Sequence, residues 1–212
     1  MISEFTSKKT GWLALAVGIM GILAVLSLIL FFVGLFQNID SLSFMGALND
    51  MINAITGILG AVLASQLHPA LRRALEPRLS LLVLLSGWAG AVCITVGSWL
   101  VQSGRADVEL SSYYFFFGNG LIALWLWTLN QAARRHSDWP RTLTILGSMA
   151  SLFMMLGLLS LPGILLGLDG SQYSTLVMIS GISFLGTGIL YPFWCLWLAR
   201  WVFVSREQSQ EG

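Results

Sequence analysis

Six long apolar segments follow one another along this chain of 212 residues, and the short segments that join them carry most of the charge. A helix of about 20 apolar residues is long enough to cross the hydrocarbon core of a bilayer. We therefore predict an all-α integral membrane protein, with six transmembrane helices in a single domain. The predicted spans lie at about residues 12–36, 43–67, 79–101, 113–133, 142–166 and 173–202.

The composition supports this fold class and argues against a soluble domain. Hydrophobic residues make up 56% of the chain and charged residues 10%, and the mean hydropathy is +0.80. A soluble domain has about 25% charged residues. The first apolar run is too long for the apolar part of a cleaved signal peptide, so we expect it to be retained as a span. Cys93 and Cys195 fall inside apolar runs, and we expect neither a disulfide framework nor a metal site from them.

The basic residues predict the orientation of the helices in the membrane. Ten of the eleven Lys and Arg residues flank the predicted spans on one side, and only Arg105 lies on the other. Basic residues are enriched on the cytoplasmic side of membrane proteins. We therefore expect both termini in the cytoplasm and the protein in the plasma (inner) membrane.

Similarities between spans favour an internal repeat. When the third and fifth spans are aligned on Gly87 and Gly147, both have another glycine ten positions later, at Gly97 and Gly157. The fourth and sixth spans share a Gly-polar-Gly sequence that is followed by two tryptophans and an arginine. Three helical hairpins in the same orientation, related by an axis along the membrane normal, would account for this pattern. The alternative is convergence, because Leu, Gly and Trp are common in any membrane helix.

The strongest candidate for a functional site is a polar cluster at the start of the second span. Asn49, Asp50 and Asn53 lie within little more than one helical turn, and Asp50 is the only acid clearly inside a predicted span. Facing such groups toward lipid costs kilocalories, so they should face protein or water. Together with Asn119 and Thr187 from the fourth and sixth spans, they predict a ligand or ion pocket in the outer half of the bundle. The alternative is that Asp50 marks a helix start near the head groups and serves no ligand.

Three environments for Asp50 follow from physical chemistry. The carboxyl group could be protonated and hydrogen-bonded to the neighbouring asparagines. It could face a water-filled vestibule that is open to the outer side. It could also form an ion pair with Arg105, the one basic residue predicted on that side.

The helical period divides the second span into two faces. A stripe of small and polar residues is predicted to pack against other helices: Gly46, Asn49, Asn53, Gly57, Gly60 and Ala64. The opposite, apolar face is predicted to contact lipid: Ile52, Ile55, Leu59, Val62 and Leu63. A further set of residues, the tryptophans of the fourth and sixth spans, could line a pigment or quinone pocket, although helix packing and interfacial belts are alternatives: Trp125, Trp127, Trp194 and Trp197.

Basic residues at the predicted cytoplasmic ends are candidates for lipid contact. We expect Arg72, Arg73, Arg134 and Arg135 to bind lipid head groups. In the segment 67–80, Leu71 and Leu75 could lie on one side of a short turn in the membrane plane, with Arg72 and Arg73 toward the head groups. The alternative is that the basic residues of this segment serve only to orient the helices.

The sequence contains no arrangement typical of catalysis. His68 and His136 lie at predicted cytoplasmic helix ends, and no H-E-x-x-H motif occurs. We therefore expect no enzyme activity, no metal site and no cofactor, and no nucleic acid among the partners.

Two functions remain open. One is a non-enzymatic accessory subunit, or a bundle that binds an apolar small molecule, lipid or pigment. The other is a small channel or transporter with a polar site around Asp50, Asn53 and Asn119. The expected partners are membrane lipids, with other membrane-protein subunits or a second copy of the chain as further candidates. A hydrated rather than a dry bundle core would favour transport.

Overall fold

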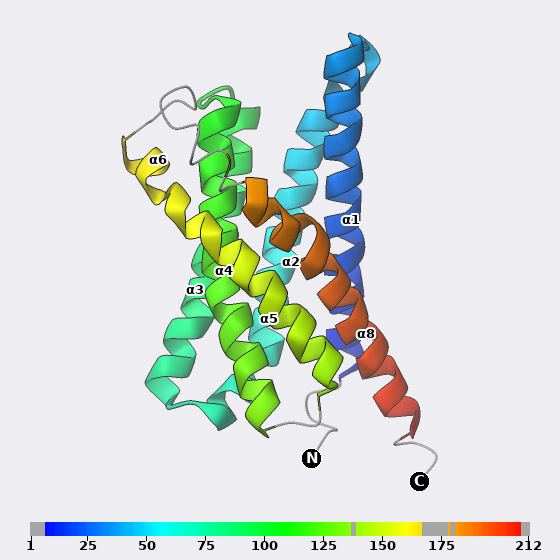
Figure 1. The fold of residues 1–212 in the computed structure, drawn as a ribbon, viewed down its shortest axis with the longest axis vertical. Coiled ribbons are helices and arrows are strands. Elements are labelled where there is room, and N and C mark those ends of the chain that lie inside the picture. The colour runs from blue at the N-terminus through cyan, green and yellow to red at the C-terminus, as the bar shows by residue number, and fades with distance from the viewer. Residues whose placement is uncertain (1–6, 137–138, 167–177, 179–180, 209–212) are drawn as a thin grey trace.

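The computed structural model describes residues 7–136, 139–166, 178 and 181–208, and nearly all of these residues are helical (Figure 1). No strand occurs within these ranges, so the predicted all-α fold is confirmed for them. The elements are α1 (Lys8–Gln37), η2 (Asp40–Leu42), α2 (Phe44–Ala74), α3 (Pro77–Gln102), α4 (Val108–His136), α5 (Arg141–Met155), η3 (Leu156–Ser160), α6 (Leu161–Leu166), the π-helical η4 (Leu185–Leu190) and α8 (Tyr191–Gln208).

Five helical segments are long and apolar enough to cross a membrane. They are Lys8–Gln37, Asp40–Ala74, Pro77–Gln102, Arg141–Leu166 and Gly181–Ser205. These segments correspond to five of the six predicted spans. The predicted beginning of the last span, at residue 173, lies outside the described residues. The helices therefore suit a protein that resides in a membrane.

The remaining predicted span, α4, is long enough but less apolar. It has 29 residues, or roughly 43 Å at about 1.5 Å per residue. Its tyrosines, tryptophans and asparagines lower its hydropathy. It packs against α2, α3, α5, η3 and α6, and both Asn119 and Asn130 are buried. Because protein rather than lipid covers much of this helix, it can carry polar groups that a lipid-facing helix could not. That α4 crosses the membrane stays a prediction.

The helices form a closed ring. Each long helix packs against the next one in the sequence, and α8 packs against both α5 and α1. The beginning of α1 and the end of α8 lie at the same end of the bundle, which we call the terminal end (Figure 1). We call the opposite end, where α1 and α2 are joined, the distal end. An even number of crossings, such as the predicted six, would place the beginning of α1 and the end of α8 at the same end of the bundle, as observed. The cytoplasmic location of the termini and the three-hairpin repeat stay predictions.

Glycines bring neighbouring backbones into direct contact. A Cβ atom added to Gly90 in α3 would collide with the carbonyl oxygen of Gly118 in α4, and one added to Gly118 would lie 2.6 Å from the carbonyl oxygen of Gly90. On the other side of the ring, a Cβ atom on Gly21 in α1 would lie 2.6 Å from the side chain of Pro192 in α8. Because these glycines have no side chain, α3 can approach α4 closely, and α1 can approach α8 closely.

The predicted faces of α2 are partly correct. The stripe that contains Gly57, Gly60 and Ala64 is buried, as expected. The prediction that Ile52 and Leu63 contact lipid is wrong, because their side chains are only 6% and 0% exposed. Both flank the small-residue stripe, and the ring covers more than the stripe itself. Apolar residues suit a protein core and a bilayer equally well, so helical periodicity could not distinguish the two environments.

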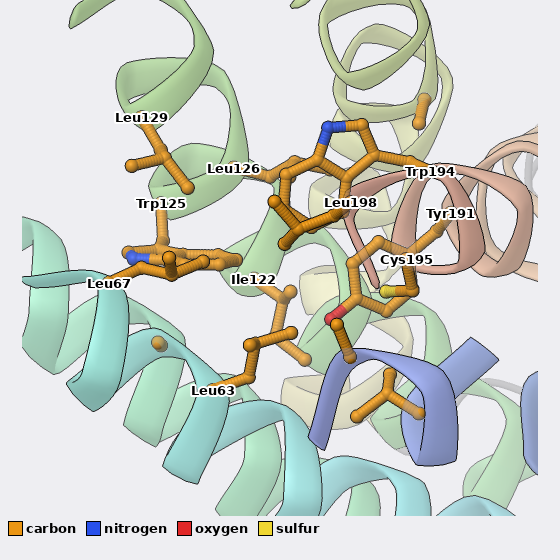
Figure 2. Packing of buried hydrophobic residues seen from close by; sticks show 14 of the residues in the cluster. Leu63, Leu67, Ile122, Trp125, Leu126, Leu129, Tyr191, Trp194, Cys195 and Leu198 are labelled. Carbon is orange, nitrogen blue, oxygen red and sulfur yellow. The ribbon is translucent and has the colours of Figure 1, made fainter. Parts of the chain in front are cut away.

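The terminal half of the bundle has a tightly packed apolar core. Figure 2 shows Leu63 of α2 and Trp125 of α4 facing Trp194 of α8. The Trp125 and Trp194 rings meet edge to face, with 6.4 Å between their centroids. Trp127 and Trp197, by contrast, lie exposed on the bundle surface. The four tryptophans therefore do not line one pigment or quinone pocket, and the two buried ones fill the core.

Candidate functional site

A cavity of about 170 Å³ lies in the distal half of the ring. Its walls come from α1, α2, α3, α4 and the segment that includes η4 and the beginning of α8. All five residues predicted to form a polar pocket line this cavity: Asn49, Asp50, Asn53, Asn119 and Thr187. The fold therefore brings together side chains from three predicted spans, while their role in binding a ligand stays a prediction.

Asp50 lines the cavity. Its carboxylate has no hydrogen bond or ion pair with another residue in the described ranges. Arg105, the candidate ion-pair partner, instead places its guanidinium carbon 4.8 Å from the centre of the Trp99 ring. Within the described residues, Asp50 therefore has neither the bond to the asparagines nor the ion pair with Arg105. A water-filled vestibule around Asp50 stays a prediction. A carboxylate in such a place is stabilised by water or by a bound ligand, because no neighbouring side chain compensates its charge.

The two asparagines of α2 form a connected pair. The amide nitrogen of Asn49 donates a hydrogen bond of 2.7 Å to the carbonyl oxygen of Ala24 in α1. The amide nitrogen of Asn53 donates to the side-chain oxygen of Asn49 at 3.0 Å. Asn49 thus fixes α2 against α1 in addition to lining the cavity. Asn53 has no partner outside α2 among the described residues, so it is the more available of the two for a ligand.

Asn119 and Thr187 reach the cavity from the other side of the ring. The amide nitrogen of Asn119 donates to the carbonyl oxygen of Phe115 at 2.8 Å. The hydroxyl oxygen of Thr187 is buried and has no hydrogen-bond partner in the part of the chain that the structure describes. Buried hydroxyls without partners are uncommon in folded proteins, and such a group is suited to bind a ligand or an ordered water.

The backbone of η4 explains the position of Thr187. Pro192 has no backbone N–H, so it cannot donate the helical bond that would normally reach back four residues. The N–H of Tyr191 donates to the carbonyl oxygen of Gly186, five residues back, which is the π-helical pattern. π-Helical segments occur frequently at functional sites. Here the segment places Thr187 and Gly188 on the cavity wall.

Sequence reasoning missed several residues that line the cavity. Tyr191 lies one helical turn after Thr187, and its hydroxyl is beside the Cys195 thiol, a weak acceptor. It has no nitrogen or oxygen partner in the described chain. Ser98 of α3 also lines the cavity. The spacing of Thr187 and Tyr191 was the available signal, but a tyrosine or a serine occurs too often in packed helices to indicate a site.

The cavity is closed toward the terminal end. Its lining ends at Gly60 in α2 and at Ile122 in α4. The next large buried side chains along these helices and α8 are those of Leu63, Trp125 and Trp194, and all three are fully buried. Figure 2 shows these residues packed across the ring. A layer of packed, fully buried side chains therefore separates the cavity from the terminal end.

The basic residues predicted to contact lipid lie at the terminal end. Arg72 and Arg73 are exposed in the last turn of α2, and Arg134 and Arg135 are exposed near the end of α4. The predicted in-plane turn at 67–80 is wrong, because α2 continues as one helix to Ala74 and α3 begins at Pro77. The exposed positions are compatible with head-group contact, which stays a prediction.

The described residues contain no group of three or more His, Cys, Asp or Glu side chains that could hold a metal ion. A search of protein-family models, of curated protein sequences and of solved structures finds no match to this chain, so its function is inferred from the cavity alone.

Proposed function

We propose that this chain is a non-enzymatic membrane transporter of a small polar solute, and that the distal cavity is its solute-binding site. The observation that carries the proposal is the Asp50 carboxylate, which has no partner among the described residues and lines a cavity that lies within the helix ring and is closed toward the terminal end. Ionisable groups within membrane-spanning helices commonly mark the path of a substrate or an ion.

The closed terminal half favours a transporter over a channel. A channel requires a continuous hydrated path, whereas the side chains of Leu63, Trp125 and Trp194 are fully buried in a single packed layer. A transporter in a state open to one side has a cavity on that side and a packed barrier on the other. Most of the lining is apolar, but the carboxylate and amide groups of Asp50, Asn53 and Asn119 are placed on it. These groups suit a solute that carries polar groups better than a wholly apolar lipid tail or pigment.

Irregular backbone beside the cavity supports a conformational change. The π-helical η4 forms part of its wall, and the 3-10 helical η3 interrupts the helical run of α5 and α6 against α4. Interrupted helices near the middle of the membrane are typical of secondary transporters, in which they surround the substrate site. Within the described residues, these two segments interrupt helical runs, whereas the 3-10 helical η2 only joins α1 to α2. We propose that η3 and η4 are the hinges.

The proposal is tested by solute flux into sealed proteoliposomes. Three probes of similar size and different charge are used: protonated ethanolamine, ethylene glycol and glycolate. The variant Gly60→Leu places a large side chain in the cavity, because Gly60 lines it. A Cβ atom added to Gly60 would have only the Tyr191 hydroxyl nearby, at 3.5 Å. The matched control is Gly181→Leu, whose Cβ atom meets nothing within 4 Å and which does not line the cavity.

We expect the unmodified protein and the control to carry at least one probe faster than empty liposomes do, and Gly60→Leu to lose most of this flux. Flux of no probe above the empty liposomes would contradict the proposal. Flux that is equal in Gly60→Leu and Gly181→Leu would also contradict it, because the solute would then bypass the cavity.

A further inference from the structure

The charge balance of the cavity restricts the solute that it can hold. Among the lining residues that the structure describes, Asp50 is the only one with an acidic or basic side chain, and the others contribute amides, hydroxyls, aromatic rings and aliphatic groups. An anionic solute would meet an uncompensated like charge there. A cation would supply the missing partner of the carboxylate, in surroundings where the low dielectric strengthens their attraction.

The lining argues against a divalent metal ion as this cation. Ca²⁺ is bound by six to eight oxygen ligands, usually with several carboxylates. The cavity offers one carboxylate, and the described residues contain no cluster of metal-binding side chains. Mg²⁺ binds through carboxylates together with phosphates or retained water. The apolar and aromatic part of this wall offers no ligands for such an ion.

The oxygen atoms of the cavity match the N–H groups of a primary ammonium ion. In the described part of the chain, the hydroxyl of Thr187 is buried without a hydrogen-bond partner, and the hydroxyl of Tyr191 lies beside the Cys195 thiol without a nitrogen or oxygen partner. Both line the same cavity as the Asp50 carboxylate. An ammonium group has three donors and no acceptor. It could therefore bind the carboxylate through a charge-assisted hydrogen bond and give its remaining donors to hydroxyl oxygens.

Aromatic rings complete the match to an organic cation. Phe115, Phe116, Phe184 and Tyr191 all line the cavity, and the Phe115 and Phe116 rings meet edge to face with 5.4 Å between centroids. Ring faces attract cations and also accept the alkyl part of an organic ammonium ion. The volume of about 170 Å³ limits the solute, since an engineered cavity of about 150 Å³ accepts benzene.

We propose that the solute is a small primary organic ammonium ion, held by the Asp50 carboxylate with Thr187 and Tyr191 as hydroxyl acceptors. This inference rests on the proposed solute-binding role of the cavity. It goes beyond that role because it names the charge and the donor groups of the solute.

The test is a calorimetric titration of the purified full-length protein in detergent with the same three probes. Ionic strength is kept constant with choline chloride, and a parallel titration uses NaCl. The variants are Asp50→Asn, which keeps shape and removes charge, and Asp40→Asn as the matched control, because Asp40 is exposed at the distal end outside the cavity.

We expect protonated ethanolamine to bind at least about tenfold more tightly than ethylene glycol, because a charge-assisted contact is worth more than a neutral one. Asp50→Asn should lose this preference and Asp40→Asn should keep it. The preference for ethanolamine over the glycol is measured in the unmodified protein, so the comparison does not depend on the variants folding.

Two results would overturn the inference and leave the proposed function intact. One is that ethylene glycol or glycolate binds as tightly as ethanolamine, with binding that Gly60→Leu abolishes. The other is that NaCl competes with ethanolamine at equal concentration, which would assign the site to an inorganic monovalent cation. Binding of none of the probes, together with the absence of flux, would overturn both proposals.

Discussion

At the scale of single residues, some threonine hydroxyls bond to the backbone of their own helix, whereas one in the cavity wall does not and is available to a solute. Thr56 and Thr128 each donate to a carbonyl oxygen four residues earlier in their own helices, at 2.7 Å. Thr187 does not make such a bond, and its hydroxyl is buried without a partner in the described chain. The π-helical backbone of η4 is the difference between these residues. A local change in helix geometry thus leaves a buried hydroxyl without a backbone partner on a residue of the cavity wall.

The roles of the two asparagines predict different effects on stability. Asn49→Leu removes the bond from the Asn49 amide to the Ala24 carbonyl and should destabilise the protein by about 1 kcal/mol, the typical worth of a polar contact between membrane helices. Asn53→Leu removes only a contact within α2 and should change stability less. Thermal unfolding of both variants in detergent measures the difference. An Asn49→Leu protein as stable as the unmodified one would show that this bond does not hold α1 against α2.

The sequence predicted the charged and amide residues of the cavity but not its other walls. Asp50, Asn53 and Asn119 are costly in lipid, so their position inside the ring followed from their chemistry alone. Tyr191 and Ser98 carry no comparable cost, since either is common at helix interfaces and membrane surfaces. Their contribution depends on how α3 and α8 are placed, which is a property of the folded ring.

At the scale of helices, close packing depends on a few glycines. Gly90 and Gly118 allow α3 and α4 to touch through their backbones, and Gly18 and Gly21 allow α1 to approach α8. Gly60 differs from these, because it faces the cavity and has almost no neighbour within 4 Å. The same residue type therefore has two uses, which are contact between helices and open space for a solute.

This difference predicts opposite outcomes for two similar substitutions. Gly90→Ala places a methyl group against the Gly118 carbonyl, so the helices must separate, and overpacking of this kind costs about 1–3 kcal/mol. Gly60→Ala adds a methyl group to the cavity wall, and Ala favours a helix over Gly by up to about 1 kcal/mol. We expect a lower unfolding temperature for the first variant and an unchanged or higher one for the second. Equal unfolding temperatures would mean that α3 and α4 are not in backbone contact.

The existence of the helices followed from apolar run length, but their irregular parts did not. The segments α1, α2 and α3 were predicted from length and hydropathy, and all three have the length and hydropathy of a membrane span. The π-helical turn lies just before Pro192, and a proline in a helix predicts a kink but not this geometry. Its geometry depends on Gly186 and on the packing of α1 against Pro192, and neither contact can be read from local sequence.

At the scale of the whole molecule, charge and polarity are divided between the two ends of the bundle. The exposed arginines Arg72, Arg73, Arg134 and Arg135 lie at the terminal end. The cavity with Asp50 belongs to the distal half. If the terminal end is cytoplasmic, as the positive-inside rule predicts, the cavity faces the outside of the cell. The solute would then enter from the outside.

This orientation predicts the reactivity of single cysteines in intact cells. Cys93 and Cys195 are first replaced by alanine. Ser41→Cys and Ser103→Cys, both exposed at the distal end, should react with an impermeant thiol reagent added outside, and Ala74→Cys should not. Labelling of Ala74→Cys from the outside with no labelling at the distal positions would mean that the protein has the opposite orientation.

The central claim is that the ring holds a polar cavity that is open only on the distal side. Cysteine scanning along α2 in sealed vesicles, in a background that lacks Cys93 and Cys195, tests it most directly. A small impermeant methanethiosulfonate is added on the distal side. We predict that Asn53→Cys and Gly60→Cys react and that Leu63→Cys and Leu67→Cys, in the buried terminal core, do not. Reaction at position 67 would reveal a continuous water path, and no reaction at positions 53 and 60 would show a dry bundle; either result would contradict the account.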